Sequence, residues 1–414
     1  MRTAKPANIR KRAPYRRANR LNVLLAFVPV SIVLEWLHLS PTLVFVSSCL
    51  AIVPLAGLMG GATEDVAGRI GSTWGGLLNA TFGNAPELII AMLALRAGLP
   101  GVVKASITGS IIGNLLLVVG LAVLLGGIRH KTQSFNQHSA GLHSSLLVMS
   151  VLALMVPAVF VRSAPGLIGG NRDPRVESLS LAVAGVLIVV YGLSLFFSLK
   201  THESLLTGIE PEAGEDRAPR GLPAAVGLLL GSTLFVALES EFLVGSIDGV
   251  TKALHLSQVF VGVVVVAIIG NAAEHVTAVV FARRNQMDLA LKIAIGSSTQ
   301  IALFVAPLLV FASLAMGHPM TFIFNTFELV SIAFAVTIVT VISLDGQTHW
   351  MEGVLLLAAY IVIALAFYYI PTEGRPAVAP APSGSTTSWL PPPAAGRGMR
   401  LQPLGEFKGS EGGQ

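Results

Sequence analysis

The stretch Gly83-Asn84-Ala85-Pro86-Glu87 begins one apolar run of this chain, and Gly270-Asn271-Ala272-Ala273-Glu274 begins another. Each places a carboxylate inside a segment apolar enough to enter a membrane, where an ionisable group is costly and points to a functional site. Gly109-Ser110 follows the first copy and Gly296-Ser297 the second, all at the same offset of 187 residues. The chain therefore uses one unit twice. Polar, glycine-containing interruptions at matching places in two apolar halves indicate the binding site of a transporter.

The composition is that of a protein with many membrane spans. Hydrophobic residues make up 53% of the chain, charged residues make up 12%, and the mean hydropathy is +0.74. Because a soluble protein carries about 25% charged residues, a soluble class is excluded. The single cysteine, Cys49, lies in an apolar run and cannot form a disulfide within the chain, so we interpret it as a small buried apolar residue.

A strongly basic arm precedes the first apolar stretch. The first 20 residues contain eight basic side chains and no acidic one. The apolar stretch ends at Glu35-Trp36-Leu37-His38 without a small-x-small cleavage signal, so we interpret it as a retained anchor rather than a signal peptide. The arm is expected to contact anionic lipid headgroups. Nucleic-acid binding is the weaker interpretation of such a charge cluster, and we expect none.

Apolar segments of about 17 to 25 residues can cross a bilayer as helices. We predict eleven of them, in an all-α integral membrane protein. They are expected near residues 22–38, 41–62, 73–96, 102–127, 141–161, 177–200, 222–247, 256–282, 289–315, 321–343 and 349–370. Lys and Arg are more numerous in the arm and in the loops on its side than in the opposite loops. The positive-inside rule therefore places the N-terminus in the cytoplasm and, after eleven spans, the C-terminus outside.

Five spans in each half give the two halves opposite directions across the membrane, so we expect inverted repeats with one extra helix before them. The predicted organisation is a basic cytoplasmic arm (1–20), transmembrane helix one (21–40), a first inverted repeat (41–200), an acidic cytoplasmic linker (201–221), a second inverted repeat (222–370) and a disordered tail rich in Pro, Gly and Ser (371–414). The linker is interpreted as a solvated connection, with a regulatory or cation-attracting role as the alternative.

Folding the inverted halves together would bring Glu87 and Glu274 to one site from opposite sides. A hard cation such as Ca2+ takes about six to eight oxygen ligands. The candidate donors are the two carboxylates, the amides of Asn84 and Asn271, and backbone carbonyls freed at Gly83 and Gly270. Two carboxylates balance a doubly charged ion. When the ion leaves, they repel one another in a poorly solvated site and take up protons. Competition between a cation and protons at one site is an antiport mechanism.

Short polar side chains farther along the chain are further candidates for binding the ion or lining its path. They are Ser110 and Asn114 in the first half and Ser297, Ser298 and Gln300 in the second. The alternative for each is close helix packing through small residues. Ser110 and Ser297 occupy matching repeat positions and form the stronger pair. His275 is interpreted either as a proton-handling residue or as a structural histidine.

A second pair of acidic residues precedes the motifs. Thr63-Glu64 and Ser240-Glu241 match each other, and Glu64 and Glu241 could pass cations or protons towards the centre from a vestibule. The alternative is a position at the surface end of a helix. We prefer that surface position for Asp65, Glu239 and Asp248.

These residues resemble the cation/proton exchangers of the Ca2+/H+ antiporter type, within the Ca2+/cation antiporter superfamily. The resemblance covers about residues 40–370 and depends on Gly75–Ile90, Gly270–Ala278, Met287–Ala290 and Gly296–Pro307. It implies eleven helices with an acidic segment between helices six and seven. It also implies Ca2+ export in exchange for protons, with Glu87 and Glu274 as shared ligands. Pro86 and Gly113 depart from the family's usual pattern.

Alternatives within and outside this class stay in view. A Na+- or Mn2+-handling exchanger of the same superfamily is the first, and a passive cation channel is the second. An intramembrane enzyme is not favoured, because the sequence has no His-Glu-x-x-His motif, phosphate loop or nucleophile elbow. We expect no cofactor; the partners are Ca2+, H+ and membrane lipid, and the short loops suit a bacterial inner membrane. Stoichiometry and oligomeric state are left open.

Overall fold

The computed structural model describes residues 20–163, 173–201 and 220–370, and helices account for most of them. The first part contains η1 Arg20–Ala26, α1 Phe27–Trp36, α2 Pro41–Ala67, α3 Ser72–Phe82, α4 Ala85–Arg96, α5 Pro100–Ile112, η2 Gly113–Val118, α6 Val119–Gly127, α7 Gln137–Ser163, α8 Pro174–Phe196 and η4 Phe197–Thr201. The second contains α10 Leu222–Leu254, α11 Gln258–Phe260, η6 Val261–Val266, α12 Ala267–Gly270, α13 Ala272–Arg283, α14 Met287–Gln300, η7 Ile301–Val305, α15 Ala306–Ala315, α16 Thr326–Ile342 and α17 Trp350–Tyr369. The basic arm before Arg20, the acidic linker at 202–219 and the tail from 371 lie outside the described residues.

Within the described residues, seven helices are long and apolar enough to cross a membrane, and the number rises to nine if each of two bent pairs is one span. Two shorter apolar helices, Leu21–Trp36 and Thr326–Ile342, lie where further spans were predicted. The mostly helical, multi-pass architecture is therefore confirmed. The full count of eleven and the inverted relation of the halves stay predictions.

Both bent pairs break at the repeated motif. The angle between α3 and α4 is 48°, and the angle between the segment ending in α12 and α13 is 59°. Gly83 and Gly270 stand at the ends of α3 and α12, and the next residues, Asn84 and Asn271, leave helical geometry with φ −103° and −89°. Pro86 in the first turn of α4 has no N–H to continue the hydrogen-bond ladder. The breaks free backbone polar groups in the middle of two apolar helices, which a membrane protein tolerates only where they face protein or water.

Two π-helical turns also recur in the two halves. η2 follows α5 and η7 follows α14, and the five residues of η7 lie 187 positions after the last five of η2. A π turn contains one extra residue and often occurs at a functional site. Here each turn adjoins the polar run that was predicted to line the ion path, Ser110 to Asn114 in one half and Ser297 to Gln300 in the other.

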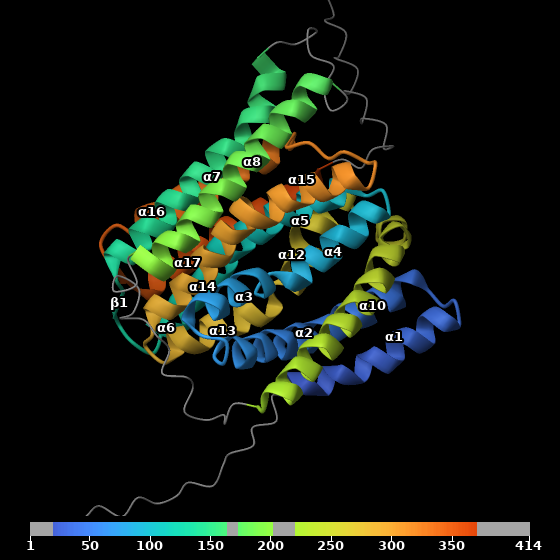
Figure 1. Cartoon of the computed structure of the whole chain (residues 1–414), viewed down its shortest axis with the longest axis horizontal. Coiled ribbons are helices and arrows are strands. Elements are labelled where there is room, and N and C mark those ends of the chain that lie inside the picture. Colours follow the sequence, from blue (N-terminus) through green and yellow to red (C-terminus); the bar gives the residue numbers. More distant parts are fainter. Residues whose placement is uncertain (1–19, 164–172, 202–219, 371–414) are drawn as a thin grey trace, which may run out of the picture. The chain divides into compact units, whose positions relative to one another are not determined.

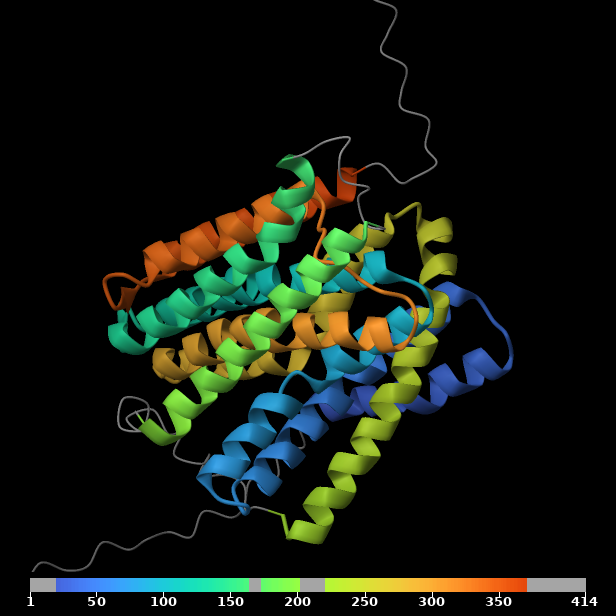
Figure 2. The same cartoon turned by 45° about the horizontal axis from the view of Figure 1, so that its top comes forward.

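The helices form two groups. α1, α2 and α10 lie side by side, and we call them the α1–α2–α10 group (Figure 1; Figure 2). The larger group contains α5, α14 and η6, which contribute much of the main buried apolar cluster. α5 and η6 approach closely because Gly109 has no side chain: a Cβ there would lie 2.0 Å from the carbonyl O of Val263. The helices that carry the candidate site are therefore packed tightly against one another.

A short antiparallel sheet ties two loops of the larger group together. β1 (Gln133–Ser134) pairs with β2 (Gln347–Thr348). The buried side chain of Gln133 donates to the carbonyl O of Ala282 at 2.7 Å and to Asn285 Oδ1 at 3.1 Å. These bonds fix the C-terminal end of α13, so the helix that begins with the second motif is anchored to the larger group.

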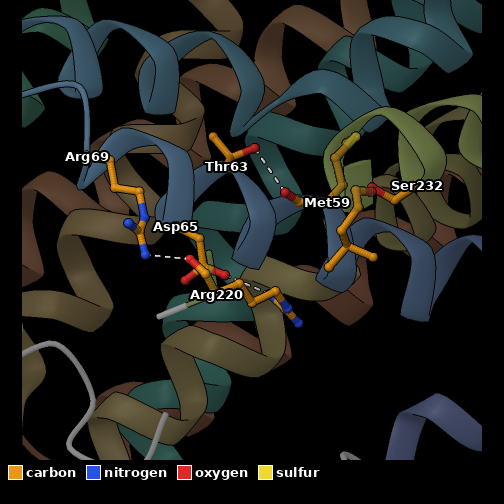
Figure 3. A network of polar contacts seen from close by, with 7 residues as sticks. Met59, Thr63, Asp65, Arg69, Arg220 and Ser232 are labelled. Atoms are coloured by element: carbon orange, nitrogen blue, oxygen red, sulfur yellow. Dashed lines mark hydrogen bonds and ion pairs between the residues drawn. The ribbon is translucent and has the colours of Figure 1, made fainter. Parts of the chain in front are cut away.

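Polar contacts join α2 to α10 near one end of the α1–α2–α10 group (Figure 3). Arg220 pairs with Asp65 at 2.8 Å, and Arg69 donates to the carbonyl O of Arg220 at 2.6 Å. Farther along, the hydroxyl of Thr233 lies 3.4 Å from the sulfur of Met59. These contacts link α2 to α10 at two places along their length.

Candidate functional site

The two helix breaks present one carboxylate each. Glu87 lies in the first turn of α4, and Glu274 lies in the first turn of α13. The N-terminal end of a helix carries partial positive charge, which favours a negative group there. The two carboxylates are close enough for their charges to repel one another. The structure thus brings together the two acids that the sequence repeat singled out.

Glu87 packs against the first glycine of the other motif. Its side chain is 6% exposed. A Cβ placed on Gly270 would lie 3.2 Å from Cγ of Glu87 and 3.5 Å from its Oε1. Glycine at position 270 therefore leaves the space that the glutamate side chain occupies.

Asn84 connects the first break to α14. Its Oδ1 accepts a hydrogen bond from the hydroxyl of Ser297 at 2.9 Å, and its Nδ2 donates to Oε1 of Gln300 at 2.5 Å. Ser297 also adjoins the carboxylate of Glu274. One hydroxyl thus stands between the amide of the first motif and the carboxylate of the second.

Asn271 makes the matching connection from the second break to α5 and η2. Its Nδ2 donates to Oγ of Ser110 at 2.9 Å and to the carbonyl O of Ala267 at 2.9 Å. Its Oδ1 accepts from Nδ2 of Asn114 at 3.1 Å. Each asparagine therefore binds the serine of the other half, and the two links occupy matching repeat positions.

Several buried oxygens of this cluster have no donor. Oε2 of Glu87, Oε2 of Glu274 and Oδ1 of Asn114 make no hydrogen bond within the part of the chain that the structure describes. A buried acceptor without a partner is costly. A proton or a cation satisfies a carboxylate oxygen, and carboxylate and amide oxygens are the ligands of a hard divalent cation. These oxygen atoms are suited to bind a divalent cation as a transported ion.

The two broken helices differ in how far they are covered. Trp74 on α3 is 68% exposed, whereas its repeat counterpart Val261 in η6 is 0% exposed. Asn79 is exposed, and its counterpart Val266 is 2% exposed. Glu274 at the start of α13 is half-buried. The less covered segments of the two broken helices are thus α3 and α13.

Four other predicted residues stand outside this hydrogen-bond network. Ser298 is buried, and its hydroxyl donates to the carbonyl O of Ala294 in its own helix at 3.0 Å. His275 is half-buried, and its Nε2 has no partner among the described residues. Glu64 and Glu241 are exposed on α2 and α10, respectively. None of the hydrogen bonds of the described cluster includes any of these four.

One buried acid was missed by the sequence reasoning. Glu239 on α10 was predicted at the surface end of a helix, yet its side chain is 0% exposed and lies 2.6 Å from the hydroxyl of Ser31. The prediction was wrong because α1 and α2 cover this face of α10. No clear signal in the sequence identifies this contact, because serines within apolar helices commonly donate to a carbonyl of their own helix, as Ser31 does to Val28.

Comparison with known sequences gives consistent matches. Residues 40–200 and 224–369 match the family described as sodium/calcium exchanger protein. The chain is 49% identical over 362 residues to the Ca(2+)/H(+) antiporter of Aphanothece halophytica, covering 84% of this chain and 96% of that protein. It is 50% identical over 365 residues to the Ca(2+)/H(+) antiporter of Synechocystis sp., covering 84% and 97%. The names of these relatives are those of transporters, as expected from the sequence.

Solved structures give the same match in three dimensions. The structure of native YfkE is 39% identical, with a TM-score of 0.73 over 84% of this chain and 99% of that one. The H+/Ca2+ exchanger CAX has a TM-score of 0.63 over 84% of this chain and 91% of that one. Its sequence identity is 14%, so this second match shows a shared fold.

Proposed function

This chain belongs to the sodium/calcium exchanger protein family, and on that premise we propose that it is a secondary transporter that exchanges Ca2+ for protons across a membrane. Its relatives at 49% and 50% identity are named Ca(2+)/H(+) antiporters. The observation in the structure that best supports the proposal is the meeting of the two motifs, with Glu87 against Gly270 and within range of the charge on Glu274.

In the proposed mechanism, Glu87 and Glu274 bind the cation and the protons in turn. One doubly charged cation balances both carboxylates. Without it, both carboxylates take protons, because poorly solvated surroundings and mutual repulsion disfavour two bare charges. The unpartnered Oε2 atoms of the two residues support this role. Since Ca2+ and protons compete for the same oxygens, export of one ion is coupled to entry of the other.

The two asparagines are the proposed amide ligands. Oδ1 of Asn84 accepts from Ser297 and Oδ1 of Asn271 accepts from Asn114. A cation that enters would take these oxygens, and the Ser297 hydroxyl would turn to Glu274, which it already adjoins. Rotation of hydroxyl and amide groups thus exchanges ligands without a change in the backbone.

We propose eleven spans, arranged as one extra helix and two inverted five-helix repeats. The recurrence of the breaks at Asn84 and Asn271 and of the π turns η2 and η7 at one offset supports the repeat. In alternating access, the α1–α2–α10 group would shift against the larger group. With the N-terminus in the cytoplasm, α3 and α13 lie at the cytoplasmic side, so the half-buried Glu274 corresponds to an inward-facing state.

The remaining predicted residues have accessory roles in this proposal. Glu64 and Glu241, exposed on the two long helices of the α1–α2–α10 group, would attract cations to the site. His275 and Ser298 would line the approach to the carboxylates. The proposed location is the plasma membrane of a bacterium, with lipid as the surrounding partner.

Transport by the purified protein in proteoliposomes tests the proposal. We expect Ca2+ uptake that follows an imposed pH gradient and collapses when a protonophore is added. Uptake that follows a Na+ gradient instead would favour the Na+-handling alternative, and stronger flux of Mn2+ would change the assigned cargo. Ca2+ movement without any proton countermovement would indicate a passive channel.

A further inference from the structure

We propose that Glu239 is a second proton-binding site, separate from the transport pair, and that the proton bound there holds α1 against α2 and α10. The carboxyl lies where these three helices meet. It contacts Ser31 of α1 and adjoins Ser48 of α2, and all three side chains are 0% exposed. The site is thus internal to the α1–α2–α10 group.

Ser31 is the hydrogen-bond partner of Glu239 among the described residues. Oγ of Ser31 lies 2.8 Å from the carbonyl O of Val28 and 2.6 Å from Oε1 of Glu239. A hydroxyl has one hydrogen to donate, and a carbonyl oxygen can only accept. Ser31 can give its hydrogen to Oε1 of Glu239 or to the carbonyl O of Val28, but not fully to both. A protonated Glu239 can donate to Ser31 while Ser31 donates to Val28, so the neutral acid is the form that satisfies both contacts.

An ionised Glu239 would have little to stabilise it. Its Oε2 has no hydrogen-bond partner within the described ranges. Ser48 adjoins the carboxyl, yet its hydroxyl makes no hydrogen bond of acceptable geometry there. A carboxylate buried without a counter-charge or sufficient donors is strongly disfavoured relative to the neutral acid.

The charged groups on the helices around Glu239 do not stabilise its ionised form. The other ionisable side chains on α1, α2, α4 and α10 are Glu35, Cys49, Glu64, Asp65, Glu87, Arg96, Glu241, Asp248 and Lys252. Only Arg96 and Lys252 are cationic, and both are exposed in the last turns of α4 and α10. Lys252 follows Glu239 by thirteen residues, a distance of about 20 Å along a helix. The acids in this set would oppose a negative charge at Glu239.

Glu239 also stands outside the duplicated transport machinery. When Thr63-Glu64 is aligned with Ser240-Glu241, the residue that matches Glu239 is Ala62. The acid thus occurs in the second half only. It lies where α10 packs against α1, which is the extra helix that precedes the two proposed repeats. Loss of its proton would leave an uncompensated negative charge between α1 and its neighbours and weaken their packing. The site therefore acts as a pH-sensitive latch on the first helix.

Thermal unfolding of the purified full-length protein at a series of pH values tests the latch. The native chain holds a proton at Glu239 that the unfolded chain releases, so the Tm of the wild type is expected to fall as pH rises. Glu239→Gln stays neutral and should lack this part of the decline. Glu35→Gln, which changes an exposed carboxylate four residues after Ser31, is the matched control and should keep the wild-type profile. If Glu239→Gln declines with pH as the wild type does, the proposal is overturned.

Infrared spectroscopy provides a second test that works even if Glu239→Gln does not fold. In the double variant Glu87→Gln/Glu274→Gln, we expect a carbonyl band from a protonated carboxyl at neutral pH. Adding Ser31→Ala should shift that band, because the hydrogen bond of the carboxyl is removed. The absence of the band, or a band that Ser31→Ala leaves in place, would show that Glu239 does not hold the proton. Neither test depends on Ca2+ transport, so failure here is distinct from failure of the proposed function.

Discussion

The side chain of Glu87 rests on Gly270, so an acid of the first half covers the glycine that begins the motif of the second half. The reciprocal contact is absent from the surroundings of Gly83, where the one atom within 4 Å of an added Cβ is the carbonyl O of Asn79. The acid without such a glycine contact, Glu274, is also the half-buried one. Two motifs that match in sequence are therefore in different environments in this structure.

Gly270→Ala is expected to weaken Ca2+ binding without unfolding the protein. The new Cβ would stand 3.2 Å from Cγ of Glu87, so the carboxylate must move away from its present place. We expect the apparent Ca2+ affinity to fall roughly tenfold, which corresponds to about 1.4 kcal/mol. Gly296→Ala is the matched control, because nothing lies within 4 Å of a Cβ there. Equal losses in the two variants, measured by Ca2+ uptake at a series of concentrations, would contradict the role of this contact.

Glu87→Gln and Glu274→Gln are each expected to reduce proton-driven Ca2+ uptake to background. Each change removes one of the two charges that balance the cation and one of the groups that carry a proton. In the wild type, the apparent affinity for Ca2+ should rise with pH, because protons compete for the same oxygens. Uptake into proteoliposomes with an imposed pH gradient measures both effects, with Glu35→Gln as the control. If either glutamine variant keeps proton-driven uptake, the shared-site mechanism is wrong.

Ser297→Ala is expected to impair transport more than Ser110→Ala. The Ser297 hydroxyl donates to Asn84 at 2.9 Å and also lies next to Glu274, so its removal affects both an amide and a carboxylate of the site. Ser110 accepts from Asn271, which keeps its bond to Asn114 when the serine is removed. Rates of Ca2+ uptake at saturating and limiting Ca2+ would separate an effect on binding from one on turnover. An equal or larger loss in Ser110→Ala would refute this asymmetry.

The sequence repeat was sufficient to locate the interruptions at the two motifs, because they depend on residues in fixed register within each half. The bonds of Asn84 to Ser297 and of Asn271 to Ser110 were not predicted, because they depend on how the two halves pack. Glycine and asparagine interrupt an apolar helix by local geometry, so Asn84 and Asn271 could be identified from the chain alone. The environment of Glu239 could not be identified in this way, because it depends on how α1 covers α10. The π turns η2 and η7 likewise depend on packing, since their apolar sequences differ little from those of ordinary helices.

Gln133→Ala is expected to destabilise the protein by about 1 to 3 kcal/mol, because it removes two hydrogen bonds of a buried amide, each contributing about 0.5 to 1.5 kcal/mol. The side chain is 1% exposed and bonds to Ala282 and Asn285 at the end of α13. Gln347→Ala in the paired strand is the control, since that side chain is exposed. Exposed positions of this kind change stability by about 0.5 kcal/mol or less. Unfolding of both variants in detergent measures the difference, and similar values for the two would count against the anchor at Gln133.

Cysteine labelling is expected to detect the uneven exposure of the two broken helices. Cys49 is buried and can be replaced by alanine to give a background without cysteine. In that background, Asn79→Cys should react with a membrane-impermeant maleimide, because Asn79 is exposed, whereas Val266→Cys should not, because Val266 is 2% exposed. Since the two positions match in the repeat, a difference between them reports the conformation rather than the local sequence. If α3 lies at the cytoplasmic side, the reagent should reach Asn79→Cys in inside-out vesicles and not in right-side-out ones. Labelling only in right-side-out vesicles would reverse the proposed orientation, and equal labelling of the two positions would mean that the protein is not held open to one side.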